Sequence, residues 1–154
     1  MTDNAAYMSL DNPELPYVAA EVLDPALTSS IREDSSFGTR ERAPLAPARY
    51  SVREFFPEQK QVTTTYDRLL FSALAGPLYR EKLDGFRERW SDAALTVLDR
   101  AGFDQAVLLE SGKVSVLLAR RGKVVLTVWT NTGAGLTAHL DDFACLLDSA
   151  TPVP

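Results

Sequence analysis

The pattern of hydrophobic and polar positions becomes regular only after the first third of the chain. Residues 62–66 (VTTTY) are β-branched and aromatic, which is typical of a strand. Asp67-Arg68 suits a turn, and residues 69–73 (LLFSA) complete a hairpin. Gly76-Pro77 then predicts a break in the chain. We therefore expect the first two strands of a sheet before residue 74.

A long amphipathic segment comes next. Apolar residues recur at every third or fourth position, while charged residues occupy the other faces. The stripe consists of Tyr79, Leu83, Phe86, Trp90, Ala94, Val97 and Ala101. Gly102 is a suitable C-terminal stop. The spacing predicts one long helix over residues 78–101.

Three apolar segments follow in close order, at residues 105–110, 113–119 and 123–130. The short separators between them contain glycine, which predicts hairpins and therefore an antiparallel meander. Several positions are apolar on both faces, so we expect the sheet to be covered on both sides. A loop at 131–135 and a final amphipathic helix over 136–149 complete the pattern.

Together these elements predict an α+β fold, an α/β/α sandwich in the order ββαβββα. Its five-stranded antiparallel sheet carries the long helix on one face and the C-terminal helix on the other. Six of the nine prolines lie in the first 57 residues, and proline blocks long helices and central strands. We therefore interpret residues 1–48 as an acidic, proline-containing N-terminal extension, 49–150 as the domain and 151–154 as a tail.

Composition narrows the classes of function. The chain of 154 residues has a net charge of −5, which argues against a nucleic-acid-binding surface. No apolar run approaches the roughly 20 residues that span a bilayer, and the N-terminus lacks the features of a signal peptide. We expect a cytoplasmic protein that contacts no membrane. With one cysteine, Cys145, and one histidine, His139, we expect no disulfide, no metal site and no cofactor.

Few residues are candidates for catalysis. His139 and Asp142 lie within one turn of the last predicted helix, so they offer a contact, although a solvated histidine is the alternative. Cys145 is interpreted as a buried small hydrophobe. Asp141 and Asp142 diverge on a helix and favour its N-terminal dipole rather than one metal ion. The loop 131–135 offers amides to an anion or is simply a turn that needs glycine. We therefore expect no enzyme.

The order of elements resembles the roadblock/dynein light chain family. The best local match runs from Val107 to Leu147, where an apolar strand ending in Glu-Ser-Gly precedes KVSVLLARRGKVVLTVWTNTGAGLTAHL and the helix entry Gly135-Leu136. The resemblance covers residues 61–149. Two departures are the missing helix before the first hairpin and the large aromatic residues in the long helix.

The resemblance implies a homodimeric binding platform for small Ras-like GTPases. Its copies would pair through the long helix and the strand after it. The interface residues implied are Phe86, Trp90, Val97, Val107 and Leu109.

Two further interpretations concern partners. The basic segment Arg120, Arg121 and Lys123 is either a solvated turn or a contact with an acidic partner. The alternative function is an acidic protein that binds a single client, such as a secretion chaperone or a toxin-neutralising immunity protein. A stable dimer favours the first function, and a monomer favours the second.

Overall fold

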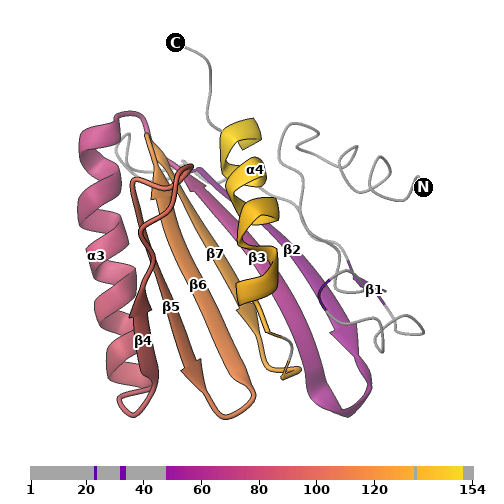
Figure 1. Ribbon diagram of the computed structural model, residues 1–154. Helices are drawn as coiled ribbons and strands as arrows, with labels where there is room; N and C mark the ends of the chain where they lie inside the picture. Colours follow the sequence, from indigo (N-terminus) through magenta and orange to yellow (C-terminus); the bar gives the residue numbers. More distant parts are fainter. Residues whose placement is uncertain (1–22, 24–31, 34–47, 134, 151–154) are drawn as a thin grey trace.

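The computed structural model describes residue 23 and residues 32–33, 48–133 and 135–150. Within them one antiparallel sheet has seven strands in the order β1-β2-β3-β7-β6-β5-β4 (Figure 1). The strands are β1 (Arg32–Glu33), β2 (Ala48–Phe56), β3 (Lys60–Arg68), β4 (Ala94–Val97), β5 (Gln105–Ser111), β6 (Val114–Arg121) and β7 (Val124–Thr130). The helices are α3 (Ser72–Arg89) and α4 (Leu140–Ala150), the latter preceded by a 3-10 turn at Thr137–His139. The fold is mixed α+β.

The predicted five-stranded sheet in the order ββαβββα is wrong, and its first hairpin is one of the reasons. The segment 69–73 is not a strand: Leu69 follows β3, and α3 begins at Ser72. The hairpin partner of β3 is β2, which pairs with it along its whole length. Glu58 and Gln59 make the reversal between them with φ of 67° and 63°. Neither is glycine or asparagine, so the usual hairpin signal is missing from the sequence.

The predicted helix over 78–101 is also wrong at both ends. It begins earlier, runs through the expected break at Gly76-Pro77 and ends at Arg89. Ala75 and Tyr79, on either side of that break, are both buried, so packing on the sheet holds the helix together there. Beyond Trp90 the chain turns into β4, which pairs with β5. This extra strand, together with β1, makes the sheet larger than predicted.

The predicted meander is confirmed as β5, β6 and β7. Gly112 and Gly122, in the two tight turns, have φ of 59° and 57°, a backbone region that glycine adopts without strain. The last predicted helix is also present, although its first turn is a 3-10 turn. Of the predicted N-terminal extension 1–48, Leu23 is buried, β1 pairs with β2, and Ala48 is already the first residue of β2. The rest of the extension lies outside the described residues, as does the tail.

The two helices pack on opposite faces of the sheet (Figure 1). The side chains of β5, β6 and β7 alternate between two clusters, which we name the α3-side core and the α4-side core. The α3-side core contains Leu69, Ala75, Tyr79, Val107, Leu109, Val116, Leu118 and Val125. The α4-side core contains Leu23, Phe56, Val62, Tyr66, Ala106, Leu108, Leu117, Ala119, Val124, Leu126, Val128, Leu136, Leu140, Phe143, Leu146 and Leu147.

Candidate functional site

The α3 face of the sheet is divided into a polar half and an apolar half. The register aligns residues of six strands into rows that run across this face. One row is Arg53, Thr63, Trp129, Val116, Leu109 and Leu95; the next is Ser51, Thr65, Thr127, Leu118, Val107 and Val97. The polar half therefore lies on β2 and β3, the apolar half on β4, β5 and β6, and β7 is the boundary.

Helix α3 covers the middle of this face and leaves a part on either side. An aromatic group anchors its C-terminal turn: the rings of Phe86 and Trp90 stack at 5.8 Å, and those of Trp90 and Trp129 at 6.5 Å. The Arg89 guanidinium lies 4.7 Å from the centre of the Trp90 ring, within the range of a cation–π contact. Trp129 belongs to β7, so these contacts fix the end of the helix against the middle of the sheet.

On the apolar side, strand β4 is incompletely covered. Its four residues are exposed, and Val97 retains 72% and Leu95 38% of its surface, although both point to the face on which α3 lies. A cavity of about 400 Å³ opens between the end of α3 and β4. It is lined by Arg87, Glu88, Trp90, Ser91, Ala93, Leu95 and Leu109. Exposed apolar side chains beside an open cavity are typical of an interaction surface.

The five predicted interface residues lie in or at the end of three different elements. Phe86 and Trp90 lie at the end of α3, and Val97 lies in the edge strand. Val107 and Leu109 lie in β5, where they are 4% and 2% exposed. The outer edge of β5, which the resemblance offers to a second copy, is paired with β4. Trp90 and Leu109 meet in the lining of the cavity.

Leu95 lies on this surface but is not among the five predicted interface residues. The helical spacing places Leu95 in the predicted helix, and the signal for a strand is the β-branched pair Thr96-Val97 that follows it.

The arginines of the predicted basic segment bind other residues of the same chain. Arg120 donates from Nε to Gln105 Oε1 at 3.0 Å and lies 3.9 Å from Asp104. Arg121 forms an ion pair with Asp148 at 3.1 Å. Lys123 accepts a hydrogen bond from the Leu69 amide through its backbone carbonyl. The segment thus ties β6 and β7 to neighbouring elements.

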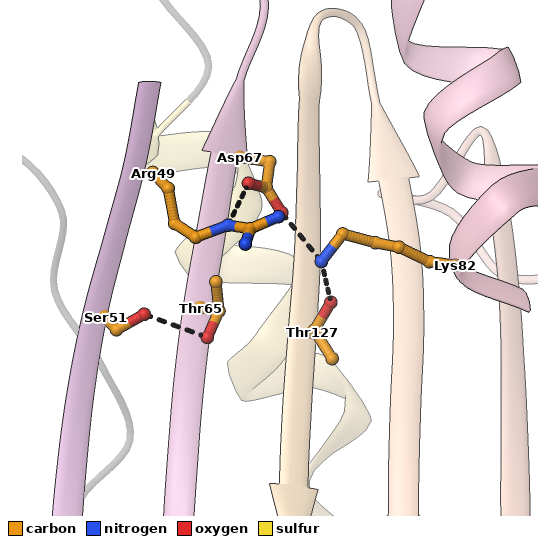
Figure 2. A network of polar contacts seen from close by, with 6 residues as sticks. All are labelled: Arg49, Ser51, Thr65, Asp67, Lys82 and Thr127. Carbon is orange, nitrogen blue, oxygen red and sulfur yellow. Dashed lines mark hydrogen bonds and ion pairs between the residues drawn. The ribbon is translucent and has the colours of Figure 1, made fainter. Parts of the chain in front are cut away.

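On the polar side, a buried carboxylate connects α3 to the sheet (Figure 2). Asp67, in β3, is fully buried, and its two oxygens lie 2.7 Å from Arg49 Nε and 2.8 Å from Lys82 Nζ. Lys82, in α3, also reaches the hydroxyl of Thr127 in β7 at 3.4 Å. A buried carboxylate is tolerated when both oxygens have charged partners. The predicted turn at Asp67-Arg68 is therefore an ion-paired part of a strand.

The predicted catalytic candidates lie apart from this face. His139 Nδ1 is 3.3 Å from Asp142 Oδ2, and Asp142 is more than half exposed. The interpretation of Cys145 as buried is wrong, since the residue is exposed on α4. Asp141 and Asp142 lie in the first turn of α4, where the dipole favours them, and Asp141 also pairs with Arg100.

The loop after β7 holds its neighbours together. The Asn131 side chain accepts from the Gln61 amide at 2.7 Å and donates to the Gln59 carbonyl at 3.0 Å. The Gly133 amide donates to the Lys113 carbonyl. Gly133 has φ of 84°, so the loop uses glycine as a turn requires. Among the described residues no group of three or more His, Cys, Asp or Glu side chains is arranged to hold a metal ion.

Comparison with known proteins gives no family: no protein-family model matches the chain, and no curated protein does. In the part of the chain that the structure describes, neither helix has the length and apolar character needed to cross a membrane.

Proposed function

We propose that the protein is a non-enzymatic interaction module that works as a homodimer, with two copies paired along β4. The observation that carries this proposal is the edge of β4, which has no neighbour on its outer side within the described sheet. Natural proteins usually block such an edge with charged residues or proline, because it is a template for another strand. The segment Ala94–Val97 contains neither.

The backbone groups free for pairing follow from the ladder with β5. The Leu98 amide donates to the Ala106 carbonyl at 2.9 Å, so Leu98 faces β5. In an antiparallel ladder, alternate residues direct both backbone groups to the same side. Thr96 therefore also faces β5, whereas Leu95 and Val97 direct their N–H and C=O groups to the open edge.

The side chains favour one register between two copies. Antiparallel pairing centred on Thr96 brings Leu95 of each copy opposite Val97 of the other, which covers the most exposed apolar surface of β4. Beyond the ends of β4, the same register brings Asp92 of each copy towards Arg100 of the other, where it would add a second acidic partner to the Asp141 that Arg100 already has. A shift of two residues in either direction loses this pairing of charges. The cavity beside Leu95 offers room for a side chain of the second copy.

Light scattering coupled to size exclusion tests the proposal on the full chain. We expect a mass of about twice the 16.9 kDa of one chain. Val97→Pro removes an N–H that faces the open edge, and proline is tolerated on edge strands, so we expect a folded monomer. The matched control is Leu70→Lys, which charges an apolar residue of 36% exposure outside β4 and retains the dimer. A monomeric wild type at micromolar concentrations, or a dimeric Val97→Pro, overturns the proposal.

The finer predictions rest on the sequence alone. Membership of the roadblock family, regulation of a small Ras-like GTPase and a cytoplasmic location stay predictions. A monomeric wild type would favour the single-client alternative, in which one partner covers the edge of β4.

A further inference from the structure

We propose that a second cavity, on the polar side of α3, binds a small aromatic anion: a planar ring that carries a carboxylate or phosphate group. The cavity has a volume of about 350 Å³, within the range of small-molecule sites. Its lining consists of Arg53, Gln61, Thr63, Phe86, Arg89 and Trp129. These side chains combine two guanidinium groups, an amide and a hydroxyl with two aromatic rings, and none is acidic.

The register explains why a cavity forms here. Arg53, Thr63 and Trp129 stand side by side on β2, β3 and β7. Strands lie about 4.8 Å apart, so Arg53 and Trp129 are separated by roughly 10 Å with only the short Thr63 between them. Phe86 and Arg89 of α3 supply the facing wall. A short side chain between two long ones leaves a depression that the sheet itself cannot fill.

The charge of the lining contrasts with that of the chain. The protein has 21 acidic residues and a net charge of −5, yet the lining has two arginines and no carboxylate. Neither arginine has an ion-pair partner within the part of the chain that the structure describes. Glu33 stands opposite Arg53 in the register, on the side away from Thr63. The planar guanidinium matches carboxylate and phosphate oxygens, and it binds them by two parallel hydrogen bonds.

Three of the lining residues, Gln61, Arg89 and Trp129, are held in position before any ligand arrives. The Gln61 backbone is bonded to Asn131 through both its amide and its carbonyl, which fixes the residue at the cavity. Trp129 stacks on Trp90, and the cation–π contact with Trp90 holds Arg89.

One turn before Phe86, Lys82 is bound to Asp67 and Thr127 and so holds α3 at a set distance from β3 and β7 (Figure 2). Because Asp67 engages Lys82, the cations that line the cavity are the two arginines. Such preorganisation lowers the entropic cost of binding.

Calorimetric titration of the full chain with benzoate and with phenyl phosphate tests the inference, since these probes carry the ring and the two kinds of anion. We expect saturable binding of at least one, and tighter binding than of acetate, inorganic phosphate or benzyl alcohol, which each lack one of the two features. The tighter probe identifies the anion that the site prefers. No saturable binding of either probe up to about 10 mM, or equal binding of the ringless ions, overturns the inference.

Variants locate the site. Arg53 is exposed, so Arg53→Gln leaves the fold intact, and we expect it to raise the Kd roughly tenfold or more. Arg89→Gln should act similarly, with a thermal melt to check that loss of the Trp90 contact leaves the protein folded. The matched control is Arg80→Gln, an exposed arginine of α3 outside the lining, which leaves the Kd unchanged. An unchanged Kd in Arg53→Gln, or an equal rise in Arg80→Gln, assigns the binding elsewhere and overturns the inference.

Discussion

Gly102 lies in the loop between β4 and β5 with φ of 97°, and α4 passes directly against it. A Cβ atom at this position would lie 2.8 Å from the Cβ of Ala144, closer than two carbon atoms approach without repulsion. The sequence pattern predicts Gly102 to be the stop of a helix. The residue is needed instead because it combines a left-handed backbone with close packing against another element.

We predict that Gly102→Ala lowers the free energy of unfolding by about 3 kcal/mol, through backbone strain and overpacking. Denaturant unfolding followed by circular dichroism measures the change. The matched control is Gly85→Ala in α3, where a Cβ meets no atom within 4 Å, and there we expect a gain of about 0.5–1 kcal/mol. Equal effects at the two glycines would contradict this explanation.

At the scale of elements, α3 is joined to the sheet by apolar contacts along one side and by one charged contact on the other. Tyr79 and Ala75 are buried in the α3-side core. The Lys82 side chain reaches across to β3, where it forms an ion pair with Asp67 (Figure 2). Asp67 forms a second ion pair with Arg49. Without Lys82, Asp67 keeps its ion pair with Arg49, but its second oxygen stays buried and loses its charged partner, which costs more than that contact itself contributes.

We predict that Lys82→Met destabilises the protein by about 3 kcal/mol, and that adding Asp67→Asn recovers much of this loss because the buried charge is then absent. Arg49 is 43% exposed, so water solvates it in the double variant. Denaturant unfolding of the two variants and of Arg80→Gln, which we expect within about 0.5 kcal/mol of wild type, measures the coupling. A double variant as unstable as Lys82→Met alone would refute the role of the buried charge.

At the scale of the whole molecule, each of the two cores contains a buried tyrosine among the described residues. Tyr66 of β3 lies in the α4-side core and Tyr79 of α3 in the α3-side core, both 3% exposed. Burial raises the pKa of Tyr79 from 10.0 to about 12, against a smaller lowering by the charge of Arg120. Burial also raises the pKa of Tyr66. Ionisation of either ring therefore opposes the packing of helix on sheet.

The sign of the resulting pH dependence follows from proton binding. Between pH 10 and about 12 an unfolded tyrosine has lost its proton while folded Tyr79 retains it, so the unfolded state binds fewer protons and stability falls as pH rises. We predict a falling free energy of unfolding above pH 10 and a shallower fall in Tyr79→Phe and in Tyr66→Phe. Guanidinium titrations at pH 9, 10 and 11 measure this, and identical slopes in wild type and both variants would contradict it.

The sequence by itself determined the parts of the fold whose signals are local. Glycines at the two tight turns and apolar strands between them predicted the meander of β5, β6 and β7, and a stripe at helical spacing predicted α4. These elements need no information about distant residues, since turn geometry and periodicity lie within each segment.

Only the tertiary structure decided the rest. Residues 94–97 fit a helical stripe as well as a strand, and β5 selects the strand by pairing with it. Asp67 has the propensity of a turn residue, yet Arg49 and Lys82, far away in the sequence, allow it to be buried in a strand. Both candidate surfaces depend on rows of side chains across strands, and such rows exist only once the register is set. The positions of both cavities and of the open edge of the sheet therefore depend on pairing between strands that are distant in the sequence, and the local hydrophobic pattern does not specify them.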